Sequence, residues 1–223
     1  MDNSLAKRYI NQHIELFGEE IFSDIGLIRY SITDDLKSSD QILLDYKSLI
    51  ENFYKDKIEI SKNNLIFGSG DSKADLLLIG EAPGDQENLK GEPFIGKSGK
   101  LLDKILKAIG YNRSNKVYLT YIIKWRLPDD RDPLPSEVEE CFPFLIRQIN
   151  IIKPKIIVAL GKVAGKILLK KDIILKEARN KKYFFNNIPL VVTYHPASLL
   201  RNQSLKKETW EDFKYIRNFL KSL

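Results

Sequence analysis

The sequence contains one cysteine, Cys141, and two histidines, His13 and His195, among 223 residues. A single thiol cannot form a disulfide within the chain, and cysteine-based zinc or iron–sulfur sites need three or four thiolates or additional histidines. We therefore expect no metal site, no disulfide framework and a reducing, cytoplasmic environment.

Long apolar runs are also missing. No stretch approaches the ~20 apolar residues of a membrane-spanning helix, and the first residues lack the basic region and apolar run of a secretory signal. We therefore expect no membrane partner, and we expect a monomer.

The charge balance favours an anionic partner only weakly. Lys and Arg outnumber Asp and Glu by 36 to 30, which gives a net charge of +6 and a pI of about 9.1. Such a balance is compatible with nucleic acid binding, but a biased Lys-rich composition explains it equally well. The hydrophobic fraction of 43% is that of an ordinary globular protein.

Four short apolar runs predict the strands of one sheet. They are ADLLLIG, VYLTYII, IIVALG and PLVVTY, at residues 74–80, 117–123, 156–161 and 189–194. Runs without strict alternation are typical of strands that are buried on both faces of a parallel sheet. Helical patterns separate them, at residues 98–109, 136–152 and 162–169, and another follows at 208–220.

This alternation predicts an α/β fold with a doubly wound, mostly parallel four-stranded sheet flanked by helices. We place this domain at residues 64–223. Residues 1–63 carry two amphipathic patterns, one around residues 10–17 and one at 42–53, and form an N-terminal helical segment. Ligands of such sheets bind beyond the carboxyl ends of the strands.

The segment GEAPGDQENLKGEPFIG, at residues 80–96, follows the first predicted strand. Its carboxylates, Glu81 and Glu87, can orient an attacking water or stabilise a developing cation on a sugar. Phe94 can offer a flat face to a base. The alternative interpretation is a surface turn with solvated acids and a core phenylalanine.

The segment HPASLLR begins at His195, where the fourth predicted strand ends. A histidine there can donate a hydrogen bond to charge that builds on a leaving base, although a lone histidine is more often structural. Leu199 and Leu200 can supply an apolar wedge for a DNA stack beside a phosphate contact from Arg201. Alternatively, both leucines belong to the core.

Basic residues lie in two further places. Lys124, Arg126 and Arg131 flank Trp125, an arrangement that suits either a nucleic-acid groove or a solvated loop. Lys162 opens a helix, whose free N–H groups attract phosphate.

Taken together, the segments GEAPGDQE, GEPFIGKSGKLLDKIL, VYLTYIIKWRLPDDRDP, IIVALGKVAGKILL and YHPASLLR resemble the type 4 uracil-DNA glycosylases. Their order and spacing match over roughly residues 65–220. The resemblance implies that uracil binds at the strand ends. It also implies base excision repair, in which the N-glycosidic bond of a flipped-out deoxyuridine is hydrolysed to leave an abasic site in DNA.

The resemblance also assigns roles to individual residues. It implies catalytic roles for Glu81, Glu87 and His195, with His195 directed toward uracil O2. It implies that uracil is bound by Gly80, Ala82, Pro83, Phe94, Tyr121 and His195. It implies that DNA is contacted by Lys162, Ser198, Leu200 and Arg201. The base would leave as an anion from an oxocarbenium-like sugar, and a hydrogen bond from His195 would stabilise that anion.

The first departure from the family concerns its iron–sulfur cluster. Many type 4 members hold such a cluster with four cysteines, whereas only Cys141 stands at a cluster position in this sequence. Trp125 occupies the place of another of those cysteines. We therefore expect no cluster and no other cofactor, with Trp125 packing into the space.

The second departure is Tyr121, which stands where the family usually has an asparagine. An amide reads the edge of uracil with one donor and one acceptor, whereas tyrosine offers one hydroxyl and more bulk. An unpaired polar edge costs about 1–3 kcal/mol. Two alternatives follow, a catalytically weakened relative that binds DNA and a glycosylase with altered base choice, for example for a deaminated purine. A nucleotide-binding domain is more distant, because glycine-rich phosphate fingerprints are missing.

Overall fold

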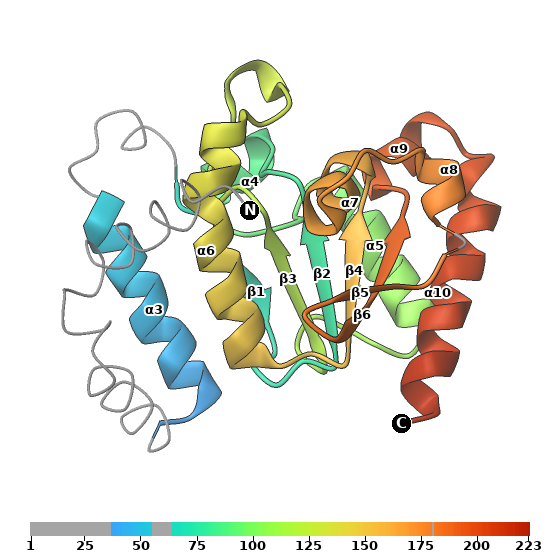
Figure 1. Ribbon diagram of the computed structural model, residues 1–223, viewed down its shortest axis with the longest axis horizontal. Coiled ribbons are helices and arrows are strands. Elements are labelled where there is room, and N and C mark those ends of the chain that lie inside the picture. The colour runs from blue at the N-terminus through green and yellow to red at the C-terminus, as the bar shows by residue number, and fades with distance from the viewer. Residues whose placement is uncertain (1–36, 55–63, 180) are drawn as a thin grey trace.

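The computed structural model describes residues 37–54, 64–179 and 181–223 of the chain (Figure 1). The helix predicted around residues 10–17 lies outside these ranges. The second predicted helix is present as α3 (Ser39–Tyr54). The domain boundary at residue 63 stays a prediction.

A six-stranded sheet forms the centre of the fold. Its strands are β1 (Ser69–Gly70), β2 (Leu76–Gly80), β3 (Val117–Tyr121), β4 (Ile156–Leu160), β5 (Tyr183–Phe185) and β6 (Ile188–Thr193). Their spatial order is β1-β3-β2-β4-β6-β5. The four predicted strands pair in parallel at the centre, which confirms the α/β fold class. Two further strands, β1 and β5, add antiparallel edges that the sequence does not predict, because they are too short to show a hydrophobic period.

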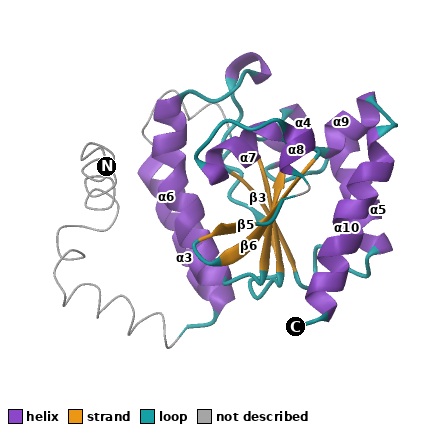
Figure 2. Ribbon diagram, turned by 45° about the vertical axis from the view of Figure 1, so that its right-hand side comes forward, coloured by secondary structure: helices purple, strands orange, loops and turns teal. Residues whose placement is uncertain are grey.

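Helices cover both faces of the sheet (Figure 2). The other helices of the described ranges are α4 (Asp85–Lys90), α5 (Lys97–Ala108), α6 (Pro135–Ile152), α7 (Lys162–Leu169), α8 (Leu175–Ala178), α9 (Pro196–Arg201) and α10 (Leu205–Lys221), with a 3-10 turn at Pro128–Asp130. One face packs against α6, with α3 outside it, and against α7 and α8. The other face packs against α5 and α10. None of the helices in the described ranges is long and apolar enough to cross a membrane.

Strand β2 illustrates why the runs look continuously apolar. Leu77 and Ile79 join the core beneath α6, whereas Leu76 and Leu78 join the core beneath α5 and α10. All four side chains are fully buried. The alternation of a strand is present, but both faces need apolar residues. Polar side chains are therefore pushed to the strand ends, and the carboxyl ends of four parallel strands meet at one edge.

Candidate active site

A cleft of about 470 Å³ opens at the carboxyl edge of the sheet. Ten of the twelve predicted site residues line it, all except Gly80 and Leu200. These ten are Glu81, Ala82, Pro83, Glu87, Phe94, Tyr121, Lys162, His195, Ser198 and Arg201. Further lining residues carry no sequence motif that predicts them, among them Ser98, Leu127 and Asp130. Arg131, from the basic segment that follows β3, lines the cleft as well.

The two exceptions lie close by. A side chain at Gly80 would come within 2.8 Å of the rings of Phe94 and Tyr121, so this glycine makes room for both rings. On α9, Leu199 is buried, whereas Leu200 is 45% exposed. Leu199 therefore belongs to the core, whereas Leu200 is accessible to a partner, as a wedge for a DNA stack requires.

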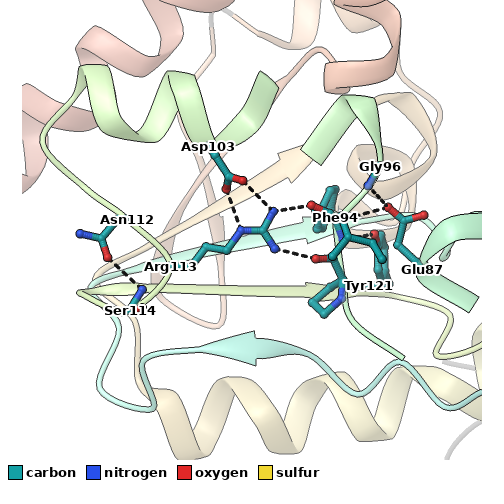
Figure 3. A network of polar contacts seen from close by, with 10 residues as sticks. Glu87, Phe94, Gly96, Asp103, Asn112, Arg113, Ser114 and Tyr121 are labelled. Atoms are coloured by element: carbon teal, nitrogen blue, oxygen red, sulfur yellow. Dashed lines mark hydrogen bonds and ion pairs between the residues drawn. The ribbon is translucent and has the colours of Figure 1, made fainter. Parts of the chain in front are cut away.

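Glu87 fixes the loop that carries Phe94. The residue is buried, and its Oε1 atom accepts the N–H groups of Ile95 at 3.0 Å and of Gly96 at 3.2 Å (Figure 3). Two charge-assisted hydrogen bonds of this kind tie the end of the loop to α4. The observed contacts of this carboxylate are therefore structural.

Glu81 is the carboxylate with a strongly shifted proton affinity. It lies in the turn that follows β2 and is partly buried. Burial, assisted by the negative charge of Asp132, raises its pKa to about 7. Near neutral pH the residue is therefore divided between its acid and its carboxylate form, as a general base requires.

His195 is uncharged at neutral pH. It caps α9, where its Nδ1 atom accepts the N–H of Ala197 at 3.2 Å. Burial, together with the positive charge of Arg201, lowers its pKa to about 4. Because Nδ1 acts as an acceptor, the ring proton resides on Nε2, which leaves a neutral donor at the cleft.

A buried ion pair holds the strand end from which His195 projects. Thr193 Oγ1 donates to the carboxylate of Asp212, and Arg179 Nε donates to the same carboxylate at 2.8 Å. The Arg179 guanidinium also lies 4.7 Å from the centre of the Tyr194 ring. Sequence reasoning missed both ionic residues, because charged residues in lysine-rich or acidic helices are normally solvated.

Phe94 and Tyr121 form a stacked aromatic pair inside the cleft wall. Their ring centroids lie 4.6 Å apart at an interplanar angle of 21°. The Phe94 N–H donates to Tyr121 Oη at 3.0 Å, and both side chains are almost fully buried. Tyr121 therefore covers one face of the Phe94 ring, which is predicted to stack on the base.

Comparison with known proteins identifies the family. The model of the uracil DNA glycosylase superfamily matches residues 67–214. The chain belongs to this superfamily. The chain is 39% identical over 164 residues to the type-4 uracil-DNA glycosylase of Archaeoglobus fulgidus. The matched residues cover 70% of this chain and 82% of that protein. The corresponding protein of Sulfurisphaera tokodaii is 40% identical over 70% of this chain and 74% of its own length, and that of Thermotoga maritima 35% identical over 74% and 87%.

The residues of this superfamily member do not fit an iron–sulfur cluster. Cys141 is the single cysteine of the chain, and burial raises the pKa of its thiol, which disfavours the thiolate that would bind iron. Trp125 belongs to the same buried cluster and packs against Tyr54 with ring centroids 5.4 Å apart. Within the described ranges, no group of three or more potential metal ligands is found.

Lys124 lies in neither of the two environments predicted for the basic segment that follows β3. Its side chain is fully buried, and neighbouring Trp125 is 6% exposed, so neither residue belongs to a solvated loop or a nucleic-acid groove. The Lys124 ammonium donates to Thr120 Oγ1 at 2.7 Å, to the Tyr121 carbonyl at 2.6 Å and to Gln148 Oε1 at 2.6 Å. These three acceptors satisfy its donors and fix the strand end that carries Tyr121.

The tautomer and pKa of His195 can be tested directly. We expect nitrogen-correlated NMR spectra of the full chain to show an imidazole with its proton on Nε2 that becomes charged only near pH 4. His13 gives the only other histidine signals, and a His195→Gln variant assigns the two sets. A proton on Nδ1, or a midpoint above pH 6, would contradict the geometry.

Proposed function

We propose that the protein is a monofunctional DNA glycosylase that hydrolyses the N-glycosidic bond of a flipped-out deoxyuridine and leaves an abasic site. The observation that carries this proposal is the neutral His195 donor, which shares one cleft with the partly protonated Glu81. Membership of the uracil-DNA glycosylase superfamily supports it. We further propose that the enzyme acts as a cytoplasmic monomer without an iron–sulfur cluster.

The proposed reaction breaks the bond between C1′ of the sugar and N1 of uracil. The base takes the electron pair and leaves as an anion, and a hydrogen bond from His195 Nε2 stabilises the charge on its O2 atom. Water adds to C1′, and the carboxylate form of Glu81 accepts the proton of that water. Because water is the nucleophile, the reaction needs no lysine Schiff base.

Basic side chains at the rim would hold the DNA. Lys162 and Arg201 line the cleft, and Leu200, the neighbour of Arg201 on α9, is exposed. Arg131 lines the cleft as well, with its guanidinium paired to the carboxylate of Glu137. Cations there suit phosphate contacts, and an exposed leucine suits the space that an extruded nucleotide leaves in the stack. These features favour a flipped nucleotide over a free base as the substrate.

Uracil release should depend on His195. We expect the wild type to release uracil from single-stranded and U·G oligonucleotides, and His195→Ala to lower the single-turnover rate by about 10²–10³-fold. Alkaline cleavage of abasic sites measures the product, and fluorescence anisotropy measures binding of the same DNA. Lys221→Ala, at the end of α10, is the control. Intact DNA binding without release by the wild type would favour the weakened relative or altered base choice.

The rate should increase with pH through the titration of Glu81. The carboxylate form is the base, and the raised pKa means that it is populated only as the pH rises through about 7. We expect the single-turnover rate to increase between pH 5 and 8 and then to level off. Asp132→Asn should move the midpoint to lower pH, because it removes one cause of the raised pKa. Glu81→Gln should lower the rate about 10²-fold and flatten the profile. A pH-independent wild-type rate would disprove the assignment.

Tyr121→Asn should increase uracil release. The amide supplies one donor and one acceptor to the edge of uracil and uncovers one face of Phe94. A recovered hydrogen bond of about 1–3 kcal/mol corresponds to roughly 5- to 150-fold in rate. Rates on oligonucleotides with uracil and with hypoxanthine measure base choice. A higher wild-type rate on hypoxanthine would support altered base choice. An unchanged uracil rate in Tyr121→Asn would show that residue 121 does not read the base.

A further inference from the structure

Phe94 has a backbone conformation that needs external support. Its φ angle is +53°, in the left-handed region, where the side chain of an L-residue crowds the following carbonyl. A bulky aromatic residue stays there only when its surroundings hold it. The ring is 1% exposed and lines the cleft, so whatever holds the backbone also fixes the wall of the base site.

Arg113 binds the backbone carbonyl groups of Phe94 and of the residue before it (Figure 3). It lies in the turn between α5 and β3, outside the cleft lining. Its Nη1 atom donates to the Pro93 carbonyl at 2.7 Å, and its Nη2 atom donates to the Phe94 carbonyl. The Nε atom donates to Asp103 Oδ1, on α5, at 2.7 Å. The planar guanidinium fork makes all three contacts at once, which a lysine cannot do.

The opposite side of Phe94 is fixed as well. Its N–H is bound by Tyr121 Oη, and the two following N–H groups are bound by Glu87. A Cβ atom at residue 99 would lie 1.6 Å from the Phe94 carbonyl oxygen, so glycine is required there for α5 to approach this peptide. The carbonyl is therefore enclosed between helix and guanidinium, and Arg113 donates to it from the turn that precedes β3.

We propose that Arg113, oriented by Asp103, is a positioning residue that holds the Phe94 wall of the base site from outside the cleft. Without the guanidinium, the Pro93 and Phe94 carbonyls lose their donor, and the left-handed peptide relaxes toward an ordinary conformation. The ring then no longer stays aligned against Tyr121. The kinetic consequence rests on the proposed glycosylase function, whereas the structural consequence does not.

The structural arm measures amide hydrogen exchange of the full chain without DNA. Arg113→Ala should accelerate exchange of the Phe94 amide at least tenfold, while the amides of β2 and β4 keep their protection. Arg113→Lys should resemble Arg113→Ala, and Asp103→Asn should give a smaller effect. Arg217→Ala, on α10, removes one positive charge elsewhere and should change nothing. Unchanged protection of Phe94 in Arg113→Ala and Arg113→Lys would overturn the proposal.

The kinetic arm is a double-mutant cycle on single-turnover uracil release. We expect Arg113→Ala to lower the rate about 10- to 100-fold with unchanged DNA affinity. Millimolar guanidinium should restore part of this loss, but none of the loss in His195→Ala. In a Phe94→Ala background, Arg113→Ala should have little further effect, because its influence passes through Phe94. If Arg113→Ala lowers the rate by the same factor with and without Phe94→Ala, the two residues act independently and the positioning role is overturned.

The two arms separate the hypotheses. If the wild type releases no uracil and Arg113→Ala loses protection of the Phe94 amide, the glycosylase function is disproved and the positioning role of Arg113 is supported. If the wild type releases uracil and Arg113→Ala releases it at the same rate, the glycosylase function is supported and the positioning role is disproved. If Arg113→Ala melts at low temperature, Arg113→Lys and Asp103→Asn decide the question, because they keep most of the side-chain volume.

Discussion

Burial of both faces of the parallel sheet is the constraint on which the site depends. Strands β2, β3, β4 and β6 are covered by helices on each side, so nearly every side chain along them must be apolar. Polar chemistry is thereby confined to the carboxyl ends, where backbone leaves the sheet. Residues separated by more than a hundred positions, such as Glu81 and His195, reach one cleft because their strands are parallel.

Burial at the cleft shifts the pKa values of Glu81 and His195 in opposite directions. Removal from water disfavours the charged form of either group, so the pKa of the acid rises and that of the histidine falls. Glu81 moves to about 7 and His195 to about 4. The two shifts leave a neutral donor and a weak base in the same cleft at neutral pH. A cationic histidine would attract an anionic leaving group more strongly, but a neutral donor needs no charge to be buried before the base leaves.

Sequence reasoning predicted the fold class, the four central strands and most of the cleft, and its failures share one physical cause. Strand runs and strand-end motifs are local in sequence, so Glu81 and His195 could be located from their position after apolar runs. Lys124, Arg113 and Arg179 are polar residues that each have at least one partner far away along the chain. Each resembles a solvated residue in a charged segment, because sequence shows the charge but not the acceptors that let it be buried. The edge strands cannot be predicted from the sequence for a related reason, since strands that pair across two or three residues are too short to show a hydrophobic period.

Tyr121 links base recognition to the fixing of the loop. A tyrosine hydroxyl has one hydrogen to donate, and in this protein it accepts the N–H of Phe94. Its acceptor capacity is thus partly committed to the loop, while its hydrogen remains available to a carbonyl oxygen. An amide at this position would be too short to reach the same N–H from the strand end, so it could read a base fully only by releasing Phe94 to other supports. The Arg113 and Glu87 contacts on the neighbouring peptide groups provide such supports. Residue 121 can therefore be replaced without loss of the loop, provided that these two side chains hold the backbone on either side of the ring.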